Sequence, residues 1–531
     1  MVNVVRQTAC IGTRFRNVAA SAGDRVCVFD QQKLSFAELD QRSDSVAAAL
    51  AAAGIQPGER VGLLCPNGAD FVTAYLGILK SGATVVPLNL LLNPREMAYI
   101  LSDSGAGGLI HHAAFDQAAD QATQGLDYRI RVRIGDDAIP GMVRLSDLWQ
   151  QTSDPIPAPD LDIHQAVAVI LYTSGTTGRP KGAMLTHANL ISNAASVIEV
   201  MEITADDRML VVLPMFHAFA GTAGLLTSLL SGCGIVSVPR FEPRLVSQAI
   251  ADHGATIFLG VPSMYAVLLR LDDAAIAQWR TIRLGVSGGA AMPLAVMAAF
   301  EDRFAIPVVE GDGPTECGPV TCVNPPTGLR KPGSVGPPVP GVQMKILDEQ
   351  GQPVPDGTMG EVCVRGPSVM KGYFNQPEAT REAFFGQWFR TGDLGTRDSD
   401  GYFYLVDRLK DLIIVNGMNV YPRAIEEVLY QHEWVAEAAV VGDPDPRHGE
   451  VPVAHVVLKP EAEAEANQAP ERLRQWCRER LGRHEIPRRF HLQPALPKNA
   501  AGKILKRELR RTGEHERGVI TPPNASESES S

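Results

Sequence analysis

The strongest constraint on the fold is a repeated alternation of short apolar segments with helix-like segments. Arg60–Cys65 and Thr84–Leu88 have the character of buried strands, and Phe71–Ser81 between them has helical spacing. The same order returns at Thr256–Gly260 and at Thr281–Val286, each of which precedes a helix-like segment. Alternation of this kind favours parallel sheets that are covered by helices.

Local signals also predict where elements begin and where the chain changes character. Ser35 and Glu38 have the spacing of a capping box, so we expect an alanine-rich helix to begin there. Beyond about residue 333, strand-like segments alternate with turns rich in Gly, Pro and Asp, which predicts a smaller β-rich subdomain. A further small α/β unit is expected after Asp407–Lys410, followed by a polar tail that is too poor in apolar residues to fold alone.

Composition narrows the class of protein. The 531 residues carry a formal net charge of −11, which argues against nucleic acid as the main partner because backbone binding needs a basic face. No apolar run approaches the roughly 20 residues of a transmembrane helix, and the N-terminus lacks the apolar core of a signal peptide. The 8 cysteines are scattered and form no CxxC pair, so we expect reduced thiols and a cytoplasmic location.

The most specific local motif is the segment Thr173–Gly182, which follows the apolar strand Ala166–Leu171. Its glycines, serine and threonines leave backbone N–H groups and hydroxyls free to surround phosphate oxygens, and Lys181 adds a positive charge. It is not a Walker A loop, because two residues separate Gly178 from the lysine. We interpret it as a phosphate-binding loop rather than as an ordinary flexible turn.

This segment resembles the phosphate-loop signature of the adenylate-forming superfamily, which includes acyl-CoA synthetases, luciferases and the adenylation domains of peptide synthetases. Bacterial long-chain fatty acyl-CoA synthetases resemble the chain most, on the evidence of Leu213–His217 and Val369–Phe374. Other superfamily motifs follow in order over nearly the whole chain, at Ser287–Ala291, Gly313–Glu316, Gly360–Gly366, Thr391–Asp393, Asp407–Lys410, Gly417–Asn419 and Pro497–Lys503.

The resemblance implies a mixed α/β fold in two domains. Residues 1–409 would form a large AMP-binding domain of two α/β sheet subdomains and a distorted β-barrel. Residues 410–513 would form a small, mobile α+β domain that rotates about Lys410 between two half-reactions, and residues 514–531 a disordered tail.

The superfamily reaction has two halves. A carboxylate attacks the α-phosphate of ATP to give an acyl-adenylate and pyrophosphate, and a thiol then attacks the acyl carbon and releases AMP. The resemblance therefore implies ATP and coenzyme A as co-substrates and Mg²⁺ as the metal, held by Thr173 and Glu316 together with substrate phosphates. Taken alone, Glu316 is more simply explained as a helix N-cap carboxylate.

The nucleotide-binding roles carry over residue by residue. Lys181 and the loop hydroxyls would hold the β- and γ-phosphates, and Thr315 would touch the α-phosphate. A Gly-rich wall at 288–290 would lie against adenine and the acyl carbonyl, because small residues allow close backbone approach. Asp393, assisted by Arg408, would bind the ribose hydroxyls. The full implied set is Thr173, Ser174, Gly175, Thr176, Thr177, Gly178, Lys181, Gly288, Gly289, Ala290, Asp312, Gly313, Thr315, Asp393, Arg408 and Gly417.

The chain departs from the superfamily pattern at Asp312. An aromatic residue, generally tyrosine, usually precedes this glycine and packs on adenine. An acidic side chain there could instead accept a hydrogen bond from the adenine amino group.

The implied catalytic residues are Lys503, Glu316 and His217. Lys503, which precedes a predicted helix at Ile504–Arg511, would bridge the carboxylate and α-phosphate oxygens during adenylation. It would then withdraw while the Gly417 loop enters to line a tunnel for the thiol. On local sequence alone, Lys503 could be a solvated lysine in a basic segment. His217 would lie near the acyl carboxylate, and a buried core histidine is the equal alternative.

The segment from residue 210 to residue 262 favours a fatty or aromatic acid substrate over an amino acid. Its only acids are Glu242 and Asp252, and neither lies where amino-acid-activating relatives keep an aspartate. The expected pocket walls are Phe216, Phe219, Gly221, Val261 and Met264.

We therefore expect an ATP-dependent CoA ligase for a medium- or long-chain fatty acid. The alternative is a fatty acyl-ACP synthetase that loads a separate acyl carrier protein. A non-catalytic nucleotide or acyl sensor is less favoured. The oligomeric state stays open, with a dimer among the options.

Overall fold

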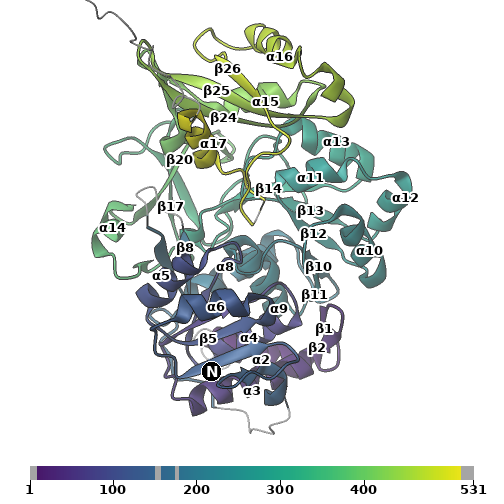
Figure 1. Ribbon diagram of the computed structural model, residues 1–531, viewed down its shortest axis with the longest axis vertical. Helices are drawn as coiled ribbons and strands as arrows, with labels where there is room; N and C mark the ends of the chain where they lie inside the picture. Colours follow the sequence, from purple (N-terminus) through teal and green to yellow (C-terminus); the bar gives the residue numbers. More distant parts are fainter. Residues whose placement is uncertain (1–8, 150–156, 174–178, 501, 516–531) are drawn as a thin grey trace, which may run out of the picture. The chain divides into compact units, whose positions relative to one another are not determined.

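The computed structural model of the chain describes residues 9–149, 157–173, 179–500 and 502–515. The chain divides into two compact units, one ending at Leu405 and the other beginning at Val406. Helices and sheets occur in both, so the expected mixed α/β class is confirmed, with a large first unit and a smaller second one (Figure 1).

The first eight-stranded sheet of the large unit carries the phosphate-loop segment. Most of its strands pair in parallel, whereas β8 and β9 form an antiparallel hairpin. Helices α5 (Pro94–Ser104) and α6 (Asp116–Thr123) pack on one face through a buried apolar cluster. In spatial order the strands are β18 (Gly372–Tyr373), β9 (Lys181–Thr186), β8 (Val167–Thr173), β4 (Thr84–Pro87), β3 (Arg60–Leu64), β5 (Ala106–His112), β6 (Ile130–Ile134) and β7 (Val143–Arg144).

The second eight-stranded sheet is also mainly parallel, with antiparallel strands at both edges. Its order is β15 (Cys322–Val323), β14 (Val308–Asp312), β13 (Leu284–Ser287), β12 (Ile257–Gly260), β10 (Arg208–Val211), β11 (Gly234–Ser237), β1 (Val26–Phe29) and β2 (Lys33–Ser35). Figure 1 shows the helices that accompany these strands, among them α10 (Pro243–His253), α11 (Pro262–Leu268) and α13 (Leu294–Phe304). The two sheets correspond to the two expected α/β subdomains.

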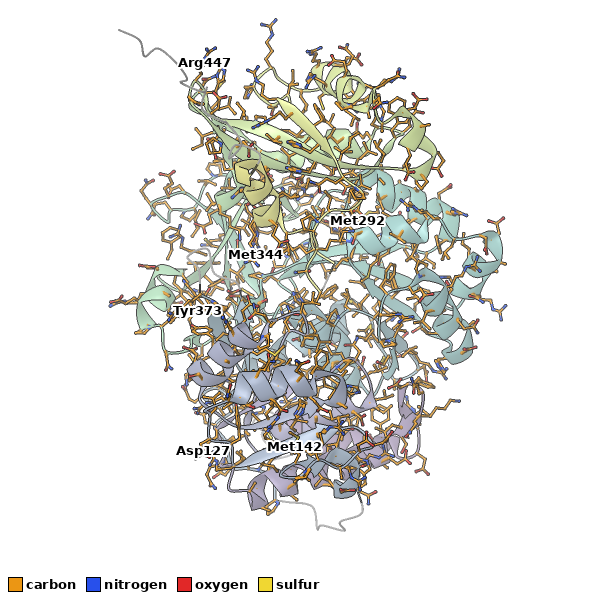
Figure 2. The ribbon with its side chains drawn as sticks, viewed as in Figure 1. Asp127, Met142, Met292, Met344, Tyr373 and Arg447 are labelled. Carbon is orange, nitrogen blue, oxygen red and sulfur yellow. The ribbon has the colours of Figure 1, made fainter. Side chains whose placement is uncertain are left out.

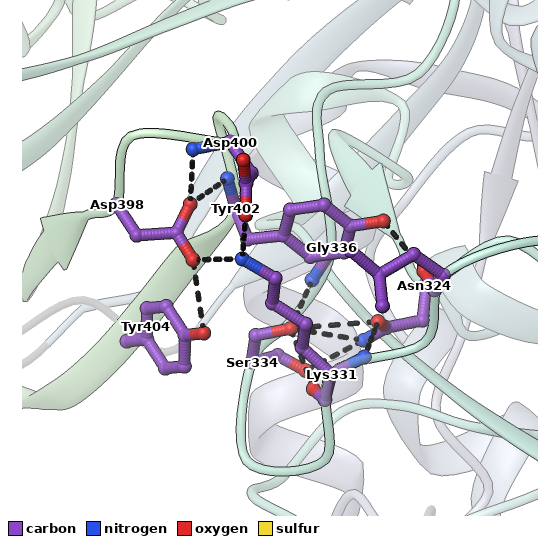
Figure 3. A network of polar contacts seen from close by, with 9 residues as sticks. Asn324, Lys331, Ser334, Gly336, Asp398, Asp400, Tyr402 and Tyr404 are labelled. Atoms are coloured by element: carbon purple, nitrogen blue, oxygen red, sulfur yellow. Dashed lines mark hydrogen bonds and ion pairs between the residues drawn. The ribbon is translucent and has the colours of Figure 1, made fainter.

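The expected distorted barrel corresponds to a five-stranded antiparallel sheet. Its strands are β16 (Gln343–Leu347), β17 (Gly360–Arg365), β20 (Trp388–Arg397), β19 (Phe384–Phe385) and β21 (Phe403–Arg408). Lys331 fastens the segment before this sheet to the β20–β21 turn, since its ammonium lies 2.6 Å from both Asp398 and Asp400 (Figure 3). The same ammonium stands 4.6 Å from the ring centre of Tyr402.

The second unit has a five-stranded sheet with helices on both faces. The strands are β23 (Met418–Val420), β22 (Ile413–Val415), β25 (Gly449–Leu458), β24 (Val435–Asp445) and β26 (Arg489–Leu492). Helices α15 (Pro422–Tyr430) and α16 (Ala469–Arg478) share one apolar core with β24 and β25. Helix α17 (Lys506–His515) packs through Leu509 on the opposite side chains of the same strands.

Several local predictions can be compared with the structure directly. The capping box is confirmed at the start of α3 (Phe36–Ala52), where Ser35 and Glu38 bond each other's backbone N–H groups. The helix expected at Phe71–Ser81 is α4 (Ala69–Lys80), and the one expected from Ile504 begins two residues later at Lys506. The remaining long helices are α2 (Ile11–Ala22) and α8 (His187–Val200). No helix within the described ranges has the length and apolar content needed to span a bilayer.

Candidate active site

The β8–β9 hairpin presents the two ends of the phosphate loop. Thr173, the last residue of β8, is paired in register with Lys181, the first residue of β9. The Thr173 hydroxyl also lies 3.5 Å from the Lys181 carbonyl oxygen. Five of the predicted loop residues, Ser174, Gly175, Thr176, Thr177 and Gly178, lie outside the described residues. The sheet thus places Thr173 and Lys181 opposite each other on neighbouring strands.

Glu316 lies against this hairpin. Its Oε1 accepts a hydrogen bond from the Tyr373 hydroxyl at 2.9 Å and lies 3.5 Å from the Thr173 hydroxyl. The Lys181 ammonium stands 5.2 Å from the ring centre of Tyr373, the β18 residue that is labelled in Figure 2. Burial and the Glu316 carboxylate raise the pKa of Tyr373, so this phenol stays a donor.

Tyr373 was not among the predicted site residues, although it belongs to the Val369–Phe374 motif that supported the resemblance. Glu316 lies in a short 3-10 helix, η4 (Thr315–Cys317), whose N-cap position is Pro314. Its carboxylate contacts Thr173 of the phosphate-loop hairpin and Tyr373 of β18, and among the described residues it makes no capping hydrogen bond to η4. Glu316 therefore lies in the first turn of η4 but is not its N-cap residue, so the N-cap alternative is wrong.

The segment that carries Thr315 and Glu316 is held in a tight turn after β14. A Cβ on Gly313 would lie 1.7 Å from the Pro319 carbonyl oxygen, so only glycine fits. Across the turn, the Asp312 carbonyl oxygen accepts hydrogen bonds from the Thr321 N–H at 2.9 Å and the Thr321 hydroxyl at 3.0 Å. The two backbone segments of the turn are therefore in direct contact, which leaves no room for a side chain at Gly313.

A buried amide on helix α8 supports the same turn from behind. The Asn193 Nδ2 donates to the Val320 carbonyl at 2.7 Å, and its Oδ1 accepts from the Val320 N–H at 3.1 Å. Asn193 is fully buried, and the Val320 peptide supplies a hydrogen-bond partner for both of its polar side-chain atoms. Sequence reasoning missed Asn193 because no local motif surrounds it.

The Gly-rich wall follows β13. A Cβ on Gly288 would approach the Phe219 ring to 3.3 Å and the Gly311 carbonyl oxygen to 3.4 Å. Gly289 has a φ of +79°, a conformation that favours glycine. Ala290 follows it in the same turn. Phe219 is thus the aromatic neighbour of this wall, and the contact of the wall with adenine and the acyl carbonyl stays a prediction.

His217 lies at the entrance to a π-helix, η2 (Phe219–Leu226), and is half-buried. Its Nδ1 lies 3.4 Å from the Phe219 backbone N–H. π-Helical turns are rare and are frequent at functional sites. Together with His217, a mainly apolar set lines a small pocket beside this turn, namely Tyr75, Pro87, Val169, Leu171, Leu190, Met215, Phe216, Ala218, Gly221 and Thr222.

Asp393 lies on β20 and is 6% exposed. Its backbone N–H donates to the Thr391 hydroxyl at 3.0 Å, and that hydroxyl donates to the Val362 carbonyl at 2.8 Å. The Thr-Gly-Asp motif is thus anchored to the neighbouring strand. Arg408, its expected partner on the ribose, belongs to the second unit.

The second unit contains the remaining predicted residues. Lys503 is exposed at the end of a turn, where its N–H donates to the Asn499 Oδ1 and its carbonyl accepts from the Asn499 N–H, both at 2.9 Å. Gly417, with a φ of +79°, forms the tight turn between β22 and β23 together with Asn416. Lys410 lies in the short helical turn that follows β21.

The ligands available for a metal are hard oxygens. Within the ranges that the structure describes, no three His, Cys, Asp or Glu side chains gather into a complete metal cage. The Glu316 carboxylate and the Thr173 hydroxyl, 3.5 Å apart, instead fit Mg²⁺, which takes one or two protein oxygens and completes its shell with water and substrate phosphates.

Comparisons with known proteins agree with this geometry. The AMP-binding enzyme family matches residues 15–374, and its C-terminal domain matches residues 424–503. A feruloyl-CoA synthase from an Amycolatopsis species is 38% identical, over 90% of this chain and 94% of its own length. A long-chain-fatty-acid–CoA ligase from Bacillus subtilis is 35% identical, over 92% of each chain.

Solved structures of CoA ligases are similar to the chain over nearly its whole length. An anthranilate CoA ligase in complex with anthranoyl-AMP has a TM-score of 0.89 and is 30% identical, covering 96% of this chain and 98% of its own. ATP-bound MatB from Rhodopseudomonas palustris has a TM-score of 0.86 at 30% identity, over 94% of this chain and 98% of its own. The chain therefore belongs to the AMP-binding enzyme family of the adenylate-forming superfamily and is an AMP-forming acid–CoA ligase that uses ATP, CoA and Mg²⁺.

Proposed function

We propose that the acid substrate is a medium- or long-chain fatty acid and that the product is its CoA thioester. The observation that carries this proposal is the apolar lining of the pocket beside His217 and the π-helix. An amino-acid substrate would need a buried carboxylate for its ammonium group. Glu242 and Asp252 are the two acids between residues 210 and 262, and both are exposed, so neither provides such a carboxylate.

Relatives with aromatic and small polar acids define the competing substrates. The feruloyl-CoA synthase and the anthranilate CoA ligase act on aromatic acids by their names, and a sulfoacetate–CoA ligase of Cupriavidus necator is 37% identical. An aromatic acid is thus the second candidate, since apolar walls suit a ring as well as a chain.

In the first half-reaction, the site residues contact the phosphates of ATP, Mg²⁺ and the acid carboxylate. Lys181 and the loop hydroxyls hold the β- and γ-phosphates, and Thr315 contacts the α-phosphate. Glu316 and Thr173 hold Mg²⁺, which neutralises phosphate charge when it is bound. Lys503 lies between the carboxylate and α-phosphate oxygens while the carboxylate oxygen bonds to phosphorus and pyrophosphate departs.

The nucleoside and the acyl group have their own contacts. Asp393 and Arg408 bind the ribose, the wall at 288–290 lies against adenine, and Asp312 accepts a hydrogen bond from the adenine amino group. His217 lies beside the acyl carboxylate. The tight turn around Gly313 keeps Thr315 and Glu316 in place for both phosphate and metal.

In the second half-reaction, the small domain turns about Lys410 and exchanges Lys503 for the Gly417 turn. The thiol then releases its proton to solvent as its sulfur bonds to the acyl carbon, and AMP departs with the electron pair of the broken C–O bond. We place the domain boundary at this hinge, with residues 410–513 as the moving domain. All 8 cysteines are free and buried, which supports a reducing, cytoplasmic location.

A panel of acids tests both the acid and the thiol acceptor. Purified protein with ATP and Mg²⁺ is offered dodecanoate, palmitate, ferulate, benzoate and sulfoacetate, each with CoA or with a holo acyl carrier protein. We expect acyl-CoA from the fatty acids. Preference for ferulate would replace the fatty acid by an aromatic one, and acyl transfer to the carrier protein alone would replace CoA as the acceptor.

A further inference from the structure

The turn that carries Lys503 is fastened on both sides by lysine–glutamate ion pairs. Before the turn, the Lys498 ammonium lies 2.7 Å from Glu437 at the start of β24. After it, the Lys506 ammonium lies 2.7 Å from Glu426 on helix α15. Both pairs are largely shielded, because all four side chains are between 15% and 27% exposed. Lys503 between them is exposed.

The pair formed by Lys506 is the better anchored of the two. The same oxygen of Glu426 that meets Lys506 also accepts a hydrogen bond from the Val440 N–H of β24 at 2.7 Å. Glu426 is therefore held by the central sheet, and Lys506 is held by Glu426. Although burial acts to lower it, the pKa of Lys506 is raised by the carboxylates of Glu426 and Asp407, so the ammonium stays charged.

The same cluster reaches the segment that precedes the hinge. Asp407 accepts hydrogen bonds from the Arg423 N–H at 2.9 Å and from the Arg408 N–H at 2.8 Å. It thereby ties the end of β21 to the first turn of α15, the helix that carries Glu426. One turn further along α17, Arg510 lies 3.1 Å from Asp411.

Loss of the Lys506 ion pair should leave helix α17 in place. Leu509 is 2% exposed and packs with Val441, Val453 and Leu496, so an apolar contact holds the helix on the sheet. What the ion pair adds is restraint on the first residue of the helix, three positions after Lys503. A displacement of about 1 Å at a reacting group can cost on the order of 10²-fold in rate.

We propose that Lys506 is a positioning residue for Lys503: its ion pair with Glu426 sets where the Lys503 ammonium stands during acyl-adenylate formation. This inference rests on the proposed role of Lys503 in that half-reaction. It assigns Lys506 no contact with substrate. The neighbouring Arg507 is exposed and makes no ion pair in the part of the chain that the structure describes, so it provides a matched control.

The test measures both half-reactions on Lys506→Met, Lys506→Arg and Arg507→Met. Lys506→Met should lower kcat for acid-dependent pyrophosphate formation on the order of 10–100-fold, with KM for ATP and acid changed less than about threefold. Thioester formation from synthetic dodecanoyl-adenylate and CoA should stay within about twofold of the parent rate. Lys506→Arg should recover most of the lost adenylation, and Arg507→Met should resemble the parent.

Other results would contradict either the proposed role of Lys503 or the proposed role of Lys506. If Lys503→Ala, assayed beside them, keeps adenylation intact, then the proposed role of Lys503 is wrong. If Lys503→Ala loses adenylation and Lys506→Met does not, then Lys506 does not position it. Equal loss of both half-reactions in Lys506→Met would show a general structural role. Glu426→Gln should reproduce Lys506→Met, and the two changes together should cost no more than either alone.

Discussion

Replacement of Glu316 by glutamine separates metal binding from folding. Glutamine keeps the shape of the side chain and an oxygen that can accept the Tyr373 hydroxyl, now 2.9 Å from Glu316. The change removes one negative charge beside the hydroxyls of Thr173 and Tyr373. Mg²⁺ prefers carboxylate oxygens, so the charge should matter far more to the metal–ATP complex than to the fold.

The magnitudes follow from these contacts. A hydrogen bond to a charged acceptor contributes about 1.5–3 kcal/mol and a neutral one about 0.5–1.5 kcal/mol, so stability should fall by about 1 kcal/mol. Loss of a ligand that stabilises charge on phosphate commonly costs about 3–4 kcal/mol, or roughly 10²–10³ in the adenylation rate. Added Mg²⁺ should recover part of this loss by mass action.

The assay is pyrophosphate exchange as a function of Mg²⁺ concentration, with thermal unfolding measured in parallel. Tyr373→Phe is the matched control, because it removes the hydrogen bond to Glu316 altogether and keeps the carboxylate. It should lose more stability than Glu316→Gln, about 1.5–3 kcal/mol, and less than about tenfold in exchange. An unchanged Mg²⁺ dependence in Glu316→Gln, or an equal loss of exchange in both variants, would refute the assignment of Glu316 as a metal ligand.

Three further predictions concern the packing around Gly313, the rotation of the small domain and the titration of His187. Gly313→Ala places a Cβ 1.7 Å from a carbonyl oxygen and should cost about 1–3 kcal/mol or more, seen as a lower Tm and weak adenylation. Lys503→Ala should lose adenylation while it still makes thioester from synthetic adenylate, and Lys410→Pro should show the reverse; equal losses in both assays would contradict the domain alternation. Burial lowers the pKa of His187 to about 4. The fold therefore favours neutral imidazole, and the stability it gains, about 3 kcal/mol at most, is present above the ordinary value near 6.5 and lost as pH falls towards 4. The fall in Tm between pH 7 and pH 4.5 should be smaller in His187→Asn, and an identical fall would contradict this.

The sequence by itself was sufficient for the order of elements and for the family. Alternation of strand and helix patterns depends on residues a few positions apart, and so does the Ser35–Glu38 capping box, which is why both could be predicted. The phosphate-loop and Gly-Pro-Thr-Glu motifs are also local. They predicted which residues carry chemistry, but not what each one touches.

The tertiary structure decided the contacts between distant segments. The Tyr373 hydroxyl meets Glu316 across 57 positions, and Asn193 holds the Val320 peptide across 127. In the local sequence, Lys506 and Arg507 are both basic residues of a basic segment. They differ because the fold brings Glu426, on another helix, to Lys506. Such pairs are formed when sheets and helices pack, so neither partner carries a local pattern that would reveal it.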